Sequence, residues 1–251
     1  MFSASRVMLG VSGTLVAYST DAVHFDGSND RLTRGADYTG NANSKLGIVS
    51  FWFNRTAGYG SETRFITNVG GTFIVAWQAA NSSIWLSGEN GPKVVRLKTS
   101  TTFAASGWHH FLASWDLGNA EAHIYVDDVD DLVAGPHLSN STIDYTQSEH
   151  GVGASTNSSG KFEGDIADVY INFAEYLDFS TTSNRRKFID SSSKPVDLGS
   201  DGSTPTGTAP IVFLHLDDGE TPANNFAINA GGGGGLSVSG ALSTAASSPS
   251  D

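Results

Sequence analysis

Residues 107–131, GWHHFLASWDLGNAEAHIYVDDVDD, show the pattern of two strands joined by a turn. The first run, 108–115, is dense in aromatic and apolar side chains. In the second run, 122–127, apolar residues stand at every other position, which is typical of a half-buried strand. Asp116, Gly118 and Asn119 supply turn-forming residues between the runs. The stretch therefore predicts a β-hairpin, and the rest of the chain must be compatible with it.

Strand signals recur along much of the remaining chain. Asp26-Gly27 separates two short apolar runs in a second expected hairpin at residues 22–34. Further strands are expected at residues 46–54, 64–69, 72–78, 83–87, 93–98, 162–173 and 211–216. A helix signal, Ser and Thr residues followed by three basic residues, occurs in STTSNRRKFI at 180–189. We expect an all-β fold, an antiparallel two-sheet sandwich.

Both ends of the chain differ in composition from its middle. We expect residues 1–21 to form an extended N-terminal arm, residues 22–218 the sandwich, and residues 219–251 a Gly/Ser-rich C-terminal tail. The tail contains five consecutive Gly and a few apolar residues that could anchor it: Phe226, Ile228, Leu236, Val238 and Leu242. We interpret the tail as an assembly element that contacts sister copies or other proteins. The alternative is that both ends fold back onto their own sandwich.

The overall charge limits the class of partner. The chain has 14 Lys and Arg against 26 Asp and Glu, a formal net charge of −12. This balance argues against duplex nucleic acid and against an anionic membrane surface, because both attract basic surfaces. Neutral glycans and other proteins remain as partners. The chain has no Cys, which excludes disulfides and favours assembly in a reducing cytoplasm.

A set of residues on the expected strands carries a resemblance to a known family. The set is Phe25-Asp26-Gly27, Trp108, His110, Trp115, Tyr125-Val126-Asp127, Phe162, Gly164, Ile166 and Val169. In these positions, over roughly residues 22–173, the chain resembles the laminin-G-like branch of the concanavalin A-like lectin/glucanase sandwiches. The resemblance implies a jelly-roll sandwich of two antiparallel sheets. It leaves the function open, because one fold hosts many functions.

The C-terminal part carries a second, narrower resemblance. Its segments are KFEGDIADVYINF, NRRKF, KPVDLGSDGSTPTG and FAINAGGGGGLSVSGALSTAASSPSD. They resemble the C-terminal half of structural proteins in tailed bacteriophages, which pair a laminin-G-like sandwich with a Gly-rich Phe-x-x-Asn ending. The resemblance implies a non-enzymatic virion protein, a capsid decoration or tail- or fibre-associated component, assembled in the host cytoplasm with sister copies and other virion proteins. The alternative is a lectin-like, carbohydrate-binding module that contacts host-surface glycans.

Three acids resemble a catalytic motif of the same superfamily. Glu163, Asp165 and Asp168 form Glu-x-Asp-x-x-Asp, whereas laminarinase-like glucanases have Glu-x-Asp-x-x-Glu, with a nucleophile first and an acid/base last. Asp168 is one methylene shorter than that last Glu, so we expect no enzyme activity, and a β-glucanase is a remote alternative. The competing interpretation is that the three are solvent-facing acids on a strand whose other face holds apolar residues.

Metal and sugar sites have weaker candidates. Asp127, Asp128, Asp130 and Asp131 follow a strand, and laminin-G and pentraxin relatives often bind calcium at such a rim, although acidic turns are commonly just solvated. His109 and His110 are adjacent on a strand, so they face opposite sides and cannot chelate one metal together. All five Trp residues are expected in the core. A Trp exposed on a concave sheet face would instead favour lectin activity. The five are Trp52, Trp77, Trp85, Trp108 and Trp115.

Overall fold

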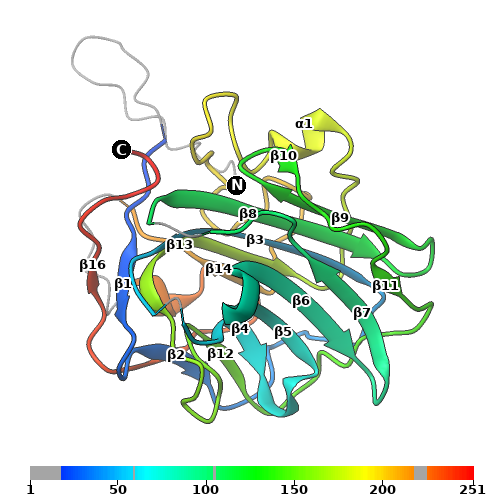
Figure 1. The fold of residues 1–251 in the computed structure, drawn as a ribbon, viewed down its shortest axis with the longest axis horizontal. Coiled ribbons are helices and arrows are strands. Elements are labelled where there is room, and N and C mark those ends of the chain that lie inside the picture. Colours follow the sequence, from blue (N-terminus) through cyan, green and yellow to red (C-terminus); the bar gives the residue numbers. More distant parts are fainter. Residues whose placement is uncertain (1–17, 59, 104–105, 218–224) are drawn as a thin grey trace, which may run out of the picture.

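The alternating segments form two antiparallel sheets that face each other (Figure 1). The computed structural model describes residues 18–58, 60–103, 106–217 and 225–251. Each sheet has eight strands. The predicted all-β, antiparallel sandwich is therefore confirmed.

The first sheet is built around the hairpin predicted at 107–131. Its strand order is β10 (Val129–Asp130), β9 (Glu121–Val126), β8 (Trp108–Asp116), β3 (Leu46–Arg55), β13 (Glu163–Asn172), β1 (Val23–Asp26) and β16 (Ser243–Thr244), with β14 (Val212–Leu214) also paired to β13. Within the hairpin, Phe111 pairs with Val126 and Asp116 with Glu121. The predicted turn residues lie where β8 gives way to β9.

The second sheet contains the strands predicted between residues 64 and 98. Its order is β11 (His137–Leu138), β7 (Lys93–Lys98), β6 (Ser83–Glu89), β5 (Phe73–Gln78), β4 (Thr63–Asn68), β12 (His150–Val152), β2 (Arg31–Arg34) and β15 (Ser237–Ser239). The 3₁₀ turns Val69–Gly71 (η1) and Ala79–Asn81 (η2) connect β4, β5 and β6. The strand β12 is three residues long, too short to show a period in the sequence.

Aromatic side chains fill the space between the sheets. Phe51 of β3 lies with its ring centroid 5.1 Å from Phe111 and 4.9 Å from Phe65, so the core joins both sheets. The indole Nε1 of Trp115 donates to the hydroxyl of Tyr145 at 3.0 Å, which satisfies the polar atoms of two buried rings. Burial of this apolar surface is the main source of stability.

A third layer covers the outer face of the first sheet. Residues 177–198, with the short helix α1 (Thr182–Arg185) at the predicted helix signal, pack there. This layer forms two apolar clusters. The first contains Ile48, Leu112, Tyr125, Tyr170, Phe179, Phe188, Leu198 and Phe213, and the second Ala22, Trp52, Ala167 and Ile189. The first sheet is therefore buried on both faces. In the described part of the chain, no helix is long and apolar enough to cross a membrane.

Residues 225–251 of the predicted tail pack on the same chain. The strand β15 pairs with β2, and β16 pairs with β1, where Figure 1 shows the two strands side by side. Phe226, in the 3₁₀ turn Phe226–Ile228 (η3), and Leu242 are buried, and Leu236 and Val238 pack against the core. Ile228 is 60% exposed. The described part of the tail thus follows the alternative in which the end folds back. Residues 1–17 of the predicted arm lie outside the described residues.

Candidate functional site

The acids that resemble a glucanase motif are engaged with other parts of the chain. Asp165 accepts a hydrogen bond from Nδ2 of Asn54 at 3.0 Å, and its Oδ1 lies 2.7 Å from Nδ1 of His24. Asp168 accepts a hydrogen bond from Oγ1 of Thr20 at 2.9 Å. The two Asp residues are only 4% and 3% exposed. The expectation that they face solvent is wrong, because residues 18–24 and the outer layer cover this face of the first sheet.

Asp168 occupies a strained and enclosed position. It lies at a bulge where the register between β13 and β3 shifts, and its φ of 46° is in the left-handed region. Burial raises the pKa of its carboxyl to about 7, although hydrogen bonds from Thr20 and Tyr18 lower it, and the charge of Asp197 adds to the rise. A carboxyl with this pKa could serve as a general acid. Here it is enclosed by Thr20 and Tyr18, so it does not complete the open carboxyl pair of a retaining glycosidase.

The acids considered for calcium point to separate partners. Asp127 binds His109 and the amide of His110, Asp128 binds Arg185 and Arg186, Asp130 binds the amide of Leu132, and Asp131 binds Ser100 and Thr101. Burial opposes ionisation of Asp128, but the hydrogen bonds from the two Arg residues lower its pKa. Among the residues that the structure describes, no group of three or more His, Asp and Glu could hold a metal ion. The cluster therefore lacks the six to eight convergent oxygens that calcium takes.

His109 and His110 project from opposite faces of β8, as predicted. The ring of His109 packs against Phe53 in the inter-sheet core, whereas His110 stacks on Trp52 on the outer face at 4.6 Å. The Nε2 atom of His110 lies 2.8 Å from Oγ of Ser50. Burial lowers the pKa of His110 to about 4, so the ring is neutral at pH 7. The Ser–His pair is enclosed and lacks the access that a nucleophile needs.

Trp85 of β6 lies on the outer face of the second sheet. Ile84 and Leu86 on either side of it point between the sheets, so alternation places Trp85 on the outer face of the second sheet. Its exposure is only 6%, because two guanidinium groups lie over the indole. The Cζ atoms of Arg96 and Arg64 are 3.8 Å and 5.4 Å from the ring centroid. The other Trp residues are buried or partly buried: Trp52, Trp77, Trp108 and Trp115.

The outer face of the second sheet is arranged differently from that of the first. In the described ranges, none of the apolar clusters packs over it. Strand pairing sets Arg64, Ala76, Trp85 and Lys98 side by side across β4, β5, β6 and β7. The small Ala76 leaves room for Arg64 to reach Trp85 from two strands away. This row, together with Arg96, is called the Arg–Trp face below.

The Arg–Trp face is basic within an acidic protein. The strands β4 to β7 carry Arg64, Lys93, Arg96 and Lys98 against a single acid, Glu89. Outside these strands, Glu62 forms an ion pair with Arg64 at 2.6 Å. Arg64 and Arg96 belong to no motif, and nothing in the sequence alone indicated them as site residues. The total charge of −12 therefore conceals one locally basic sheet face.

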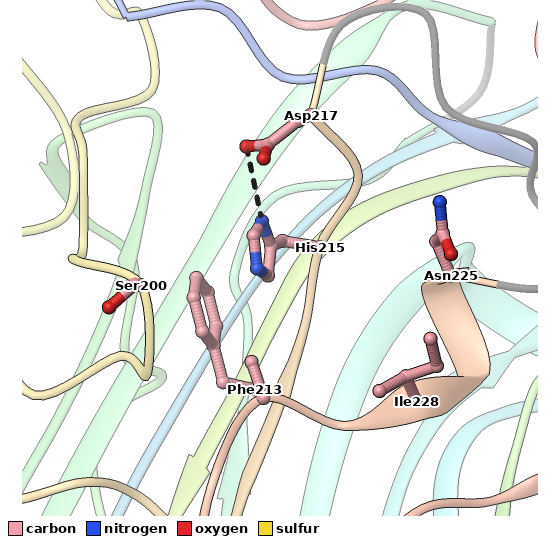
Figure 2. Close-up of a pocket in the computed structure, with 7 residues that line it drawn as sticks. Ser200, Phe213, His215, Asp217, Asn225 and Ile228 are labelled. Atoms are coloured by element: carbon pink, nitrogen blue, oxygen red, sulfur yellow. Dashed lines mark ion pairs between the residues drawn. The ribbon is translucent and has the colours of Figure 1, made fainter. Parts of the chain in front are cut away.

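A small pocket lies elsewhere, beside β14 (Figure 2). It has a volume of about 170 Å³ and is lined by Ser200, Phe213, His215, Asp217, Asn225, Ile228 and Ala230. The rings of Phe213 and His215 stack with centroids 4.5 Å apart, and Nδ1 of His215 lies 3.9 Å from Oδ1 of Asp217. Ligand pockets usually have about 300 to 1,000 Å³. This pocket is therefore smaller than a usual ligand site.

The architecture agrees with a match to a protein family. Residues 47–173, half of the chain, match the model of the Concanavalin A-like lectin/glucanases superfamily. The chain belongs to this superfamily. The resemblance on which the fold expectation was based is thereby confirmed. No curated protein matches the sequence.

Similar folds occur among solved structures. A provisionally assigned carbohydrate-binding protein from Bacteroides ovatus has 12% identity and a TM-score of 0.65, with 92% of this chain and 61% of that chain covered. The CBM40 of the Ruminococcus gnavus IT-sialidase has 9% identity and a TM-score of 0.46, with 64% and 93% covered. Domains LG4-5 of the mouse laminin α1 chain have 15% identity and a TM-score of 0.44, with 67% and 46% covered.

These likenesses concern the fold. At 12% identity even the first shows the fold alone, and this chain spans about three fifths of that protein's length. The virion hypothesis rests on the sequence segments that suggested it.

Proposed function

We propose that the chain is a non-catalytic carbohydrate-binding module whose ligand lies on the Arg–Trp face. One observation carries the proposal: an outward Trp and three basic side chains lie on the sheet face over which no third layer packs among the described residues. The proposal agrees with membership of a superfamily of lectins and glucanases. The enclosure of Asp165 and Asp168 favours binding without hydrolysis.

The chemistry of the face suits a saccharide. A sugar ring offers an apolar C–H surface and a rim of hydroxyl groups, so it binds where a flat surface is edged by hydrogen-bond donors. The guanidinium of Arg96 stacked on the indole of Trp85 provides such a flat surface. Arg64 and Lys98, on the same row, provide donors to sugar oxygens.

A glycan array with the intact chain, followed by titration of the best ligand, tests the proposal. We expect binding that Trp85→Ala reduces at least tenfold, since the substitution removes the support under both guanidinium groups. The control is Trp108→Ala, at a partly buried Trp whose Nε1 donates to Ser247 at the covered side of the first sheet. Equal loss in both variants, or binding unaffected by Trp85→Ala, would contradict the proposed site. Thermal melting shows whether each variant is folded.

A role in a virion remains the second candidate. The feature that favours it is the resemblance of the C-terminal segments, 161–173 and 226–251 among them, to phage structural proteins. The two functions are compatible, since a particle can carry a glycan-binding module. The Discussion gives a test of contacts between copies of the chain.

A further inference from the structure

We propose that the ligand of the Arg–Trp face is an acidic saccharide, whose carboxylate or sulfate group binds between Arg64 and Arg96 beside Trp85. The inference rests on the proposed function and narrows it to one chemical class. It reverses the expectation of neutral glycans that the net charge suggests.

The first argument is geometric. Arg96 comes from β7, which borders β6, and Arg64 from β4, two strands from β6 on its other side; both guanidinium carbons lie within 5.4 Å of one ring centroid. Two planar groups held by one aromatic ring present several N–H donors in a limited space. Carboxylate and sulfate oxygens match this arrangement, because they accept paired hydrogen bonds from guanidinium groups. A neutral sugar hydroxyl would use one donor at a time.

The second argument is the balance of charge. Lys98 pairs with Trp85 across the β6–β7 ladder, so a third cation lies on the same row. The ion pair between Glu62 and Arg64 compensates one of these charges, and Glu62 is 45% exposed. The residual charge of the face is positive, whereas the whole chain is strongly acidic. A basic surface on an acidic protein selects an anionic partner over a neutral one of the same shape.

The third argument is that one of the cations is partly desolvated. Burial lowers the pKa of Arg96, and the nearby charge of Arg64 adds to this effect, while Glu62 and Glu89 oppose it. The Nε1 donor of Trp85 beneath is buried without a hydrogen-bond partner in the structure. An anionic ligand group would neutralise part of the positive charge of Arg64 and Arg96. Its oxygens would accept hydrogen bonds from N–H donors that outnumber the acceptors there.

The test compares matched pairs of polymers that differ in charge alone: dextran with dextran sulfate, and methyl-esterified with de-esterified polygalacturonate. Titration calorimetry at low and high salt gives affinity and its ionic-strength dependence. We expect the charged member of at least one pair to bind and its neutral partner not to bind measurably. We also expect the affinity to fall as salt rises. The pair that binds separates sulfate from carboxylate recognition.

Variants separate a built site from general attraction to a polyanion. Arg64→Gln and Arg96→Gln should each lower the affinity at least tenfold, and Arg96→Lys should restore only part of it, because an ammonium keeps the charge but not the planar stack. Lys187→Gln, on the covered side of the first sheet, removes the same charge and should lower the affinity less than twofold. Equal losses in Arg96→Gln and Lys187→Gln would overturn the inference.

The outcomes distinguish this inference from the proposed function. If neutral glycans bind and Trp85→Ala abolishes that binding while the Arg variants do not, the proposed function stands and acidic specificity is overturned. If neither charged nor neutral saccharides bind, both are overturned. The chain could instead associate with itself through this face, which sedimentation would show and the Arg variants would reverse. That result would overturn the acidic saccharide as the ligand and assign the face to a second copy of the chain.

Discussion

The side chain of Asn229 accepts a hydrogen bond from the backbone amide of Phe213 at 2.8 Å. Its Nδ2 donates to the carbonyl groups of Ile211 at 3.1 Å and Gly234 at 2.8 Å. Phe226, three residues earlier, is fully buried in the core. The Phe-x-x-Asn motif therefore fastens the Gly run to β14 and to the core, which gives this sequence ending a structural role within the chain.

We expect Asn229→Ala to lower the free energy of unfolding by about 3 kcal/mol, because buried backbone groups lose their partners. Asn229 also has a φ of 54°, which Ala tolerates less well than Asn. Denaturant titration measures the change. The control Asn119→Ala, whose side chain bonds to Asp116 on an exposed turn, should change stability by less than about 1 kcal/mol. An unchanged midpoint in Asn229→Ala would show that the motif does not hold the tail.

The run of five Gly shows how far the fold of the tail could be predicted from the sequence. Five consecutive Gly allow either a sharp turn or a close approach to another backbone, and in the structure a Cβ at Gly233 would clash with the carbonyl oxygen of Ile211. The sequence could not show that the neighbouring backbone belongs to the same chain. That depends on the pairing of β15 with β2 and of β16 with β1, and two- or three-residue strands leave no periodic signal.

The Arg–Trp face shows how far a candidate binding site could be predicted from the sequence. Alternation in SIWLSGE and KVVRLK is enough to set Trp85 and Arg96 opposite to the core. Among the described residues, the segment 177–198 covers the first sheet with irregular structure, and no such layer lies over the second sheet. Such a segment follows no period, so its place could not be predicted. Residues 18–24, which also follow no clear period, contribute to the burial of Asp165 and Asp168, which were expected at the surface.

The buried carboxyl of Asp168 predicts a pH dependence of stability. Its pKa is raised from 3.8 to about 7 in the folded chain, mainly by burial. Between about pH 4 and pH 7 the folded state binds more protons than the unfolded state, so the free energy of unfolding falls as pH rises through this window. We expect Asp168→Asn to remove this slope and to be more stable than the wild type at pH 8, as measured by denaturant titration across the pH range.

The difference in pH dependence of the free energy of unfolding between the wild type and Asp168→Asn reports on the Asp168 carboxyl alone. Burial lowers the pKa values of His110 and His150, and these rings contribute a slope of opposite sign below about pH 6.5 in both proteins. Asp201→Asn is the control. Hydrogen bonds, mainly the one from the Ser203 side chain, lower the pKa of the Asp201 carboxyl, so this group titrates below the pH window in question. Parallel curves for the wild type and Asp168→Asn would show that the carboxyl is already ionised at pH 5.

We expect no hydrolysis of β-glucans. Asp168 is enclosed by Thr20 and Tyr18, and Asp165 is held by His24 and Asn54, so the motif offers no open acid and nucleophile pair. A reducing-sugar assay on laminarin is the measurement. Activity that disappears in Glu163→Gln, with the melting temperature unchanged, would establish a glucanase after all.

The last prediction concerns contacts between copies. Deleting the tail would not test them cleanly, because the described tail contributes Phe226 and Leu242 to the core and strands to both sheet edges. Its exposed large apolar side chain is Ile228, at 60%. If the tail mediates assembly, this side chain is the available contact. Val129, at 66%, belongs to β10 at the far edge of the first sheet and is a matched control.

We therefore expect concentration-dependent association of the intact chain in sedimentation velocity, weakened at least tenfold by Ile228→Ser and unchanged by Val129→Ser. Both substitutions replace an exposed apolar side chain, so neither should change stability by more than about 0.5 kcal/mol. Equal association of the wild type and Ile228→Ser, or a wild type that stays monomeric at every concentration, would contradict an assembly role for the described tail. In that case its residues serve to complete the two sheets, because β15 and β16 then protect the edges of β2 and β1 from pairing with another molecule.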